Sequence, residues 1–334
     1  MKTVLLIVSL LTLFSCSTKN VKNDFDYTKI EKIPDSIRIE KITVHNLFKS
    51  QILAHKDQNF DSVMVVQKVY LPHRKLWDSC YGMIFGEENG KKFNNKSGMI
   101  AWNKTLMNQD KPLIIERTNT ISSLNLSRMI TNNLKKFNTM VPYHPAAEVS
   151  IVFTPFDGIG FGGCTADQFA LELNHKSLDI NYTLEKGLPH ELNHLVYEKF
   201  RNSHSDKDSA LSQTIDEGFA CYFTYVFFDE KIQPYEAVEN MTKANWDWYT
   251  AHEKEIYTKT KAYLTDTSGD NPLLRNDRIK LFPDAPKTLY YWLGFRIVSK
   301  YVEKFGKESW KDLYKLSPQE VLDKSGYHDY ISQL

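Results

Sequence analysis

The sequence lacks three features that would indicate common classes of protein: an excess of charge of one sign, a framework of cysteines, and a long apolar run. Its 42 lysine and arginine residues are balanced by 41 aspartate and glutamate residues. Nothing in this charge indicates a nucleic acid or an anionic surface as partner. Four irregularly spaced cysteines form neither a disulfide framework nor a Cys-based zinc site. The apolar run at residues 4–14 is too short to span a bilayer, which needs about 20 residues.

That short run indicates export instead. Lys2 precedes it, and Leu13-Phe14-Ser15-Cys16 follows, which resembles a bacterial lipobox. We therefore predict a lipoprotein signal peptide at residues 1–16, with Cys16 as the lipidated first residue of the mature protein; the alternative is a plain signal peptide that happens to contain Cys16. Residues 17–30 are expected to form a polar tether to a bacterial envelope membrane. Ser17, rather than Asp, favours the outer membrane over the inner one; the face of the membrane is left open.

The chemistry of the chain is concentrated at residues 188–195, Leu-Pro-His-Glu-Leu-Asn-His-Leu. On a helix, His190 and His194 lie on nearly the same face, about 6 Å apart along the axis, close enough to bind one metal ion. Glu191 is placed to take a proton from metal-bound water. This is the HExxH pattern of zinc hydrolases and predicts Zn²⁺ as cofactor; two solvated histidines on a surface helix are the alternative. Pro189 requires the helix either to start beside it or to bend there.

Such a site needs a third ligand. The metzincin continuation fails because neither its glycine nor its histidine is present. His204 lies in a polar run that is typical of a loop. The remaining candidate is Glu217: if the first helix ends near Arg201 and the second starts after an Asp208 cap, an antiparallel hairpin brings Glu217 level with the two histidines.

Three neighbours of Glu217 have expected places. Gly218 would let the helices approach closely. Asp216 lies about 100° round the helix, so it either supports the site or faces solvent. Cys221 follows Glu217 by one turn and is expected to be buried near the metal without binding it. The three cysteines after Cys16 allow at most one disulfide and leave a free thiol.

The region before the zinc helix is expected to contain strands, including residues 37–44 and 149–154. Residues 158–163 are rich in glycine, but no Lys-Ser/Thr follows, so a phosphate loop is rejected in favour of a turn leading into a strand. In zinc peptidases, an edge strand just before the zinc helix pairs with the substrate backbone. Residues 169–173 or 178–182 could serve in this way, or form an ordinary internal strand.

Four motifs occur in one order: the glycines of residues 158–163, His190-Glu191-x-x-His194, Glu217-Gly218-Phe219-Ala220 and Tyr291-x-x-Gly294-Phe295-Arg296-Ile297-Val298. Over roughly residues 145–330, this order resembles the predicted zinc-dependent proteases of the gluzincin type, a domain family largely of unknown function. The resemblance implies that His190, His194 and Glu217 are zinc ligands and that Glu191 is the general base. Tyr291 is our candidate for a phenol that hydrogen-bonds the developing oxyanion, with Tyr290 as the alternative and simple packing as the other interpretation.

We therefore expect an α+β, zincin-like metallopeptidase: a small sheet with an edge strand packed on the HExxH helix, then a mainly helical C-terminal part. Residues 31–144 would form an N-terminal α+β region of no assigned role, and residues 145–334 the catalytic domain. The expected function is zinc-dependent hydrolysis of a peptide or protein.

Two alternatives stay open. One is a lipoprotein binding module with an inactive zinc site, which a fourth ligand such as His204 or Cys221 would support. The other is a zinc hydrolase acting on a non-peptide bond. No nucleic-acid partner is expected, and the cleavage specificity and oligomeric state are left open.

Overall fold

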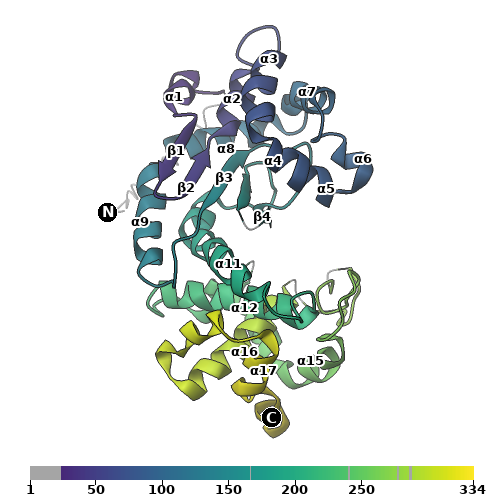
Figure 1. Ribbon diagram of the computed structural model, residues 1–334. Coiled ribbons are helices and arrows are strands. Elements are labelled where there is room, and N and C mark those ends of the chain that lie inside the picture. Colours follow the sequence, from purple (N-terminus) through teal and green to yellow (C-terminus); the bar gives the residue numbers. More distant parts are fainter. Residues whose placement is uncertain (1–23, 166, 240, 277, 286–287) are drawn as a thin grey trace, which may run out of the picture.

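The computed structural model of the chain describes residues 24–165, 167–239, 241–276, 278–285 and 288–334. The predicted signal peptide, its Cys16 and residues 17–23 of the predicted tether lie outside the described residues. As predicted, the fold is α+β, with a small mixed sheet followed by a mainly helical C-terminal part (Figure 1). Among the described residues, no helix is both long and apolar enough to cross a membrane.

The strands are β1 (Ser36–Ile39), β2 (Ile42–His45), β3 (Ala147–Val152), β4 (Phe161–Thr165) and β5 (Gln168–Glu172). The helices of the N-terminal region are α1 (Tyr27–Lys32), α2 (Leu47–Leu53), α3 (Ser62–Met64), α4 (Arg74–Leu76), α5 (Gly82–Ile84), α6 (Gly86–Gly90), α7 (Lys96–Lys104), α8 (Lys111–Ser123) and α9 (Leu126–Asn138). The later helices are α10 (Ile180–Tyr182), α11 (Leu188–Arg201), α12 (Ala210–Phe227), α13 (Pro234–Ala237), α14 (Lys243–Ala251), α15 (Glu253–Thr260), α16 (Leu289–Phe305), α17 (Pro318–Ser325) and α18 (Tyr327–Gln333).

The sheet joins strands from distant parts of the chain, in the order β1-β2-β3-β5-β4. The inner pairs β2–β3 and β3–β5 are parallel, and the outer pairs β1–β2 and β4–β5 are antiparallel. The strand predicted at residues 37–44 is instead a hairpin, because Glu40 turns the chain with a φ of 53°. Strands from both sides of the predicted boundary at residue 144 thus belong to one sheet, while the boundary itself stays a prediction.

One face of the sheet packs on the helix that carries the HExxH motif. The apolar side chains that meet there come from the sheet (Ile42, Val44, Val149, Ile151, Leu171), from α9 (Ile130, Leu134) and from the α10–α11 segment (Leu184, Leu188, Leu192). The alternation of β3, with Val149 and Ile151 on this face, is the period expected of a strand with one buried surface. This packing fixes α11 against the sheet.

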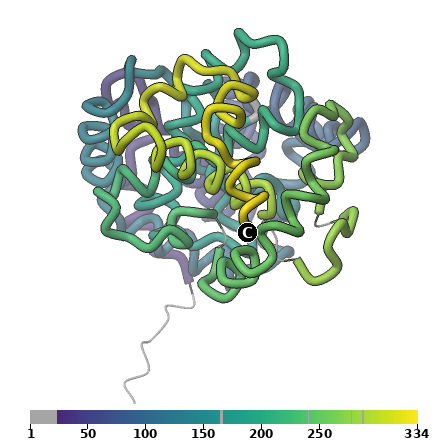
Figure 2. The backbone as a smooth tube through the Cα atoms, turned by 90° about the horizontal axis from the view of Figure 1, so that it is seen from below, coloured from purple at the N-terminus to yellow at the C-terminus, as the bar shows by residue number. Residues whose placement is uncertain are grey.

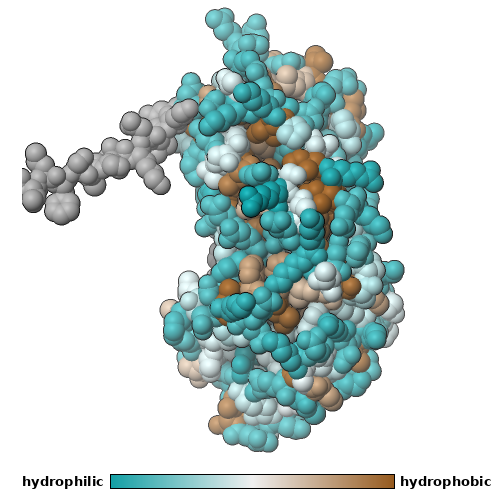
Figure 3. Space-filling view, turned by 90° about the vertical axis from the view of Figure 1, so that its left-hand side faces the viewer, coloured by the Kyte–Doolittle hydropathy of each residue, from teal (hydrophilic) through white to brown (hydrophobic). Residues whose placement is uncertain are grey.

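The C-terminal helices occupy the end of the molecule away from the sheet (Figures 1 and 2). A single apolar core nevertheless runs from Ile30 on α1 to Ile331 on α18, so the described elements are packed together. The face drawn in Figure 3 is mostly hydrophilic, with smaller hydrophobic patches near its middle.

Helices α12 and α16 approach each other closely. A Cβ atom on Gly218 would lie 2.0 Å from the carbonyl carbon of Gly294, and one on Gly294 would lie 1.9 Å from the carbonyl oxygen of Thr214. Only glycine fits at these two positions, because backbone atoms cannot move aside as a flexible side chain can. The close approach expected of Gly218 is therefore made to α16 rather than to α11.

Replacing Gly218 by alanine should separate these helices. We expect Gly218→Ala to lower the free energy of unfolding by about 3 kcal/mol or more, because the added methyl group overpacks a contact between two backbones. Chemical denaturation measures the change. Gly269→Ala is the matched control, since nothing lies within 4 Å of the Cβ that it adds, and its stability should stay within about 0.5 kcal/mol of the parent. Equal stability of the two variants would contradict this account of the crossing.

Candidate metal centre

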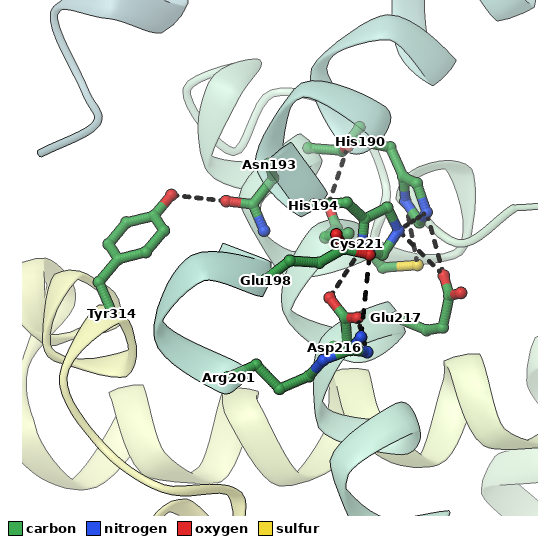
Figure 4. Close-up of polar contacts among 11 residues, drawn as sticks. His190, Asn193, His194, Glu198, Arg201, Asp216, Glu217, Cys221 and Tyr314 are labelled. Atoms are coloured by element: carbon green, nitrogen blue, oxygen red, sulfur yellow. Dashed lines mark hydrogen bonds and ion pairs between the residues drawn. The ribbon is translucent and has the colours of Figure 1, made fainter. Parts of the chain in front are cut away.

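The structure brings three of the predicted site residues together at the centre of the helical hairpin. Nε2 of His190 lies 3.1 Å from Nε2 of His194, and Oε2 of Glu217 lies 3.2 Å and 3.3 Å from these two atoms (Figure 4). Among the described residues, these three are the only group of three or more histidine, cysteine or carboxylate side chains that converge tightly enough to hold a metal ion. The donor set, two imidazoles and one carboxylate, suits Zn²⁺. Metal binding itself stays a prediction.

Local sequence explains how the first helix presents its histidines. The helical path begins at α10 and reaches α11 through a wide turn at Thr183–Gly187, where the N–H of Leu188 donates to the carbonyl five residues back. Pro189 has no N–H to continue this pattern to the carbonyl of Leu184, which accepts a hydrogen bond from Nδ2 of Asn133 at 3.0 Å instead. The helix therefore begins before Pro189, and the proline is accommodated within it.

The second helix starts one residue later than predicted. Its cap is Ser209, whose side chain accepts a hydrogen bond from the N–H of Ser212, rather than Asp208. The first helix ends at Arg201 as predicted. These bounds bring Glu217 on α12 level with the histidines on α11.

A buried network orients His194. Its Nδ1 lies 2.7 Å from Oδ1 of Asp216, which is 4% exposed and forms an ion pair with Arg201 (Figure 4). When Nδ1–H donates to this carboxylate, the lone pair on Nε2 is directed towards the converging groups. Asp216 therefore supports the candidate metal centre and does not face solvent.

The electrostatics suit a bound cation. Burial alone would lower the pKa of His194, but the carboxylates of Asp216 and Glu217 outweigh burial and raise that pKa well above its ordinary value. Burial would likewise raise the pKa of Glu217, but the two histidines hold it well below its usual range. The centre is thus built to hold positive charge next to Glu217, and a metal ion that displaces the imidazole protons would supply this charge.

The other imidazole has a different neighbour. Sγ of the buried Cys221 lies 3.8 Å from Nδ1 of His190, on the side of the ring away from the converging Nε2. Cys221 is a free thiol and Cys80 is disulfide-bonded, which agrees with the prediction of at most one disulfide and a free thiol. Neither Cys221 nor His204 belongs to the converging group, so neither supplies a fourth ligand.

Glu191 lies beside the centre, between two cavities. The apolar cavity, of about 530 Å³, is lined by Ile159, Phe161, Leu178, Tyr182, Ala237 and Met241 together with polar groups that include Asp179, Lys186 and Glu236. The polar cavity, of about 700 Å³, is lined by Glu198, Arg201, Lys207, Glu217, Tyr290 and Tyr291 among others. Glu191 borders both cavities. Burial raises the pKa of its carboxyl to about 7, although the histidines act in the opposite direction.

The edge strand beside this carboxylate is β4. It contains residues 161–163 of the glycine-rich stretch, which we predicted to be a turn leading into a strand. Neither segment named as an edge-strand candidate has that place: β5, at residues 168–172, is an inner strand, which was the stated alternative, and residues 178–182 lead into helix. A Cβ on Gly162 of β4 would lie 3.9 Å from Oε2 of Glu191. The backbone of β4 at Gly162 therefore lies close to the carboxylate, with room for ordinary van der Waals contact between them.

A buried carboxylate that sequence reasoning missed fixes the approach to this strand. Glu172 is fully buried and accepts hydrogen bonds from the N–H groups of Gly158 and Gly160 and from the hydroxyl of Tyr81, at 3.0, 2.9 and 2.6 Å. Gly160 itself has a φ of 80°, which disfavours other residues. The N-terminal region, through Tyr81, thus helps to hold β4 in place. A single glutamate at the end of an apolar strand gives no sequence signal of this role.

Both candidate tyrosines lie in the polar cavity at the start of α16. The ring of Tyr291 stacks on His190, with centroids 6.1 Å apart and planes 12° apart, and it packs against Tyr290 at 4.6 Å. Burial, followed by the nearby charge of Glu217, raises the pKa of both phenols, so both stay protonated and able to donate. The two tyrosines lie together, and which of them would donate to an oxyanion stays open.

Loss of the Asp216 charge should weaken metal binding while leaving the ligands in place. We expect Asp216→Asn to reduce the zinc affinity of the protein by about 10- to 100-fold, as is typical when the partner of a ligating histidine is changed. Competition with a chromogenic chelator measures this affinity. Asp270→Asn, which removes an exposed carboxylate, should leave it unchanged; an unchanged affinity in Asp216→Asn as well would mean that Asp216 does not orient the ligand.

The chain is similar to a family other than the gluzincin-type proteases that its motifs suggested. Residues 175–329 match the family model GldB_lipo, described as "Gliding motility protein GldB". The match includes the three converging residues, Glu191 and both tyrosines, but covers less than half of the 334-residue chain. Because this is not a gluzincin protease family, the resemblance inferred from the order of the motifs was wrong. No curated protein and no solved structure matches the chain.

Proposed function

We propose that the chain is a lipid-anchored envelope protein that hydrolyses peptide bonds at a zinc site formed by His190, His194 and Glu217. The observation that carries this proposal is the convergence of three potential ligands, rather than four, beside the carboxylate of Glu191. Structural zinc sites usually have four protein ligands, whereas hydrolytic sites have three and leave a position for water or substrate. On this proposal the fold is zincin-like.

The residues around the centre have distinct roles in this proposal. Zinc held there would polarise the carbonyl of the substrate and lower the pKa of water towards neutrality. Oε2 of Glu191 accepts the proton that water loses and then passes it to the leaving amine. The hydroxyl of Tyr291, or of its neighbour Tyr290, donates a hydrogen bond to the oxygen that gains negative charge.

A peptide is the preferred substrate class because of β4. Its outer edge has no strand partner among the described residues, so an extended chain can pair with it by backbone hydrogen bonds. Such a chain would lie beside a strand whose Gly162 is close to the carboxylate of Glu191. An ester or other small substrate has no need of this edge, and this distinguishes the proposal from a zinc hydrolase acting on a non-peptide bond.

A second candidate function is a lipoprotein binding module in which the zinc site is not catalytic. The family match favours it over cleavage, because the matched family is described as a motility protein and not as an enzyme. The short name of that family also agrees with lipid attachment at Cys16, which both candidates share. The two candidates differ in what Glu191 does.

Substitution of Glu191 distinguishes the peptidase from the binding module. The full-length protein, purified in detergent, should contain about one zinc per chain by elemental analysis, consistent with a single three-ligand centre. Glu191→Gln should keep that zinc and lose cleavage of a mixed peptide library by at least about 100-fold, because general-base catalysis contributes at least that much. His194→Ala should lose the metal as well as the activity.

The control is Glu255→Gln, which changes a carboxylate that is exposed and paired with Lys259 and should alter neither quantity. Zinc binding without any difference between the parent and Glu191→Gln on peptide, ester and amide substrates would contradict hydrolysis and support the binding module. Absence of zinc after the metal is supplied would contradict both candidates.

A further inference from the structure

The edge strand leads from one cavity to the other. Gly160, just before β4, borders only the apolar cavity, whereas Gly162 and Gly163 border only the polar one. Glu191 lies where the two cavities meet. A peptide paired along β4 would therefore place the residue on one side of the reacting bond over the apolar cavity and the residue on the other side over the polar cavity.

The walls of the apolar cavity are suited to an uncharged side chain. Phe161, Leu178 and Met241 supply apolar surface, and Ala237 adds a small apolar side chain to the wall. Pockets that bind ligands by burial have volumes of roughly 300–1,000 Å³, so about 530 Å³ is ample for one large side chain.

The lysine that lines this cavity, Lys186, is already paired and would attract an acidic side chain of the substrate only weakly. Nζ of Lys186 lies 2.9 Å from Oε1 of Glu236 and 5.6 Å from the centre of the Tyr182 ring. The hydroxyl of Tyr182 donates in turn to the carbonyl of Glu236 at 3.2 Å. The positive charge is thus already compensated. Besides Glu236, three acidic residues border the cavity, Asp179, Glu191 and Glu239, so a basic side chain is the competing occupant.

We infer that the apolar cavity is a specificity pocket that selects a bulky apolar side chain, such as Phe, Leu or Met, next to the bond that is cleaved. The inference rests on the proposed peptidase function, because it needs a peptide bound along β4. It adds the substrate class: extended peptides or unfolded segments with a large apolar residue, in preference to those with small or charged residues at that position.

Binding to the Glu191→Gln variant tests the pocket without cleavage. The probes are blocked alanine hexapeptides that carry one Phe, Ala, Lys or Glu at a central position, titrated into the full-length, zinc-loaded protein. The Phe peptide should bind at least about tenfold more tightly than the Ala peptide, which is the discrimination that burial of a few carbon atoms provides. Equal binding of all four, or tightest binding of the Lys or Glu peptide, would overturn the inference.

A filled pocket should lose this preference. Met241→Trp, added to Glu191→Gln, should reduce the ratio of Phe to Ala binding to less than about threefold, since the larger side chain occupies the space needed by the ligand. Met83→Trp makes the same change at a methionine of α5 that is 71% exposed and should leave the ratio intact. Equal ratios in the two double variants would overturn the assignment of the preference to this cavity.

Cleavage by the parent protein distinguishes failure of the pocket from failure of the proposed function. Sites cut in a peptide library, mapped by mass spectrometry, should carry Phe, Leu, Met or Tyr on one side of the cut bond. Cleavage with no such enrichment would overturn the pocket while supporting the peptidase. A Phe preference that Met241→Trp removes, in a protein that cuts nothing, would overturn the peptidase and support an apolar peptide-binding pocket.

Discussion

The crossing of α12 and α16 at Gly218 and Gly294 is the contact that places the two tyrosines beside the candidate centre. Glu217 precedes Gly218, and Tyr291 lies one helical turn before Gly294, so the distance between the two backbones decides whether the phenols reach the carboxylate. A side chain at either glycine would move α16 outward and open the polar cavity on that side. The glycines contribute no chemistry of their own. By letting α16 approach α12, they place the tyrosines of a third helix beside the converging residues of the α11–α12 hairpin.

Charge is the second constraint, because so much of it is buried in one place. Buried groups of opposite charge alternate there: Arg201 pairs with Asp216, Asp216 with His194, and His194 with Glu217. Such networks are costly to bury, and replacing them by apolar residues is often neutral or stabilising. Their cost is offset if they hold a cation, since the orientation of an imidazole by a carboxylate is what strengthens it as a metal ligand.

Local patterns predicted the helices and the converging residues well. HExxH, the polar loop after it and the spacing to Glu217 placed α11, α12 and the centre within one residue of the observed bounds. The predictions that failed concerned features that depend on contacts between residues far apart in the sequence. The glycines of residues 158–163 were expected to form a turn that leads into a strand, but the edge strand already starts at Phe161, within the stretch, where Glu172 on the neighbouring strand holds the preceding backbone. The family assignment failed for a similar reason: motifs for chemistry are short and recur, so their order did not identify the family that the chain matches.

Glu191 is the residue that most sharply divides the two candidate functions. It is not one of the three converging groups, and burial raises the pKa of its carboxyl, which means that its charged form is held at an energetic cost. A structural zinc site has no use for such a group, since an apolar side chain at that position would be cheaper to bury. A hydrolytic site needs a carboxylate there, beside the metal and open to both cavities. The position of Glu191 is therefore physically costly in a binding module and useful in an enzyme, and this argues for hydrolysis despite a family description that names motility alone.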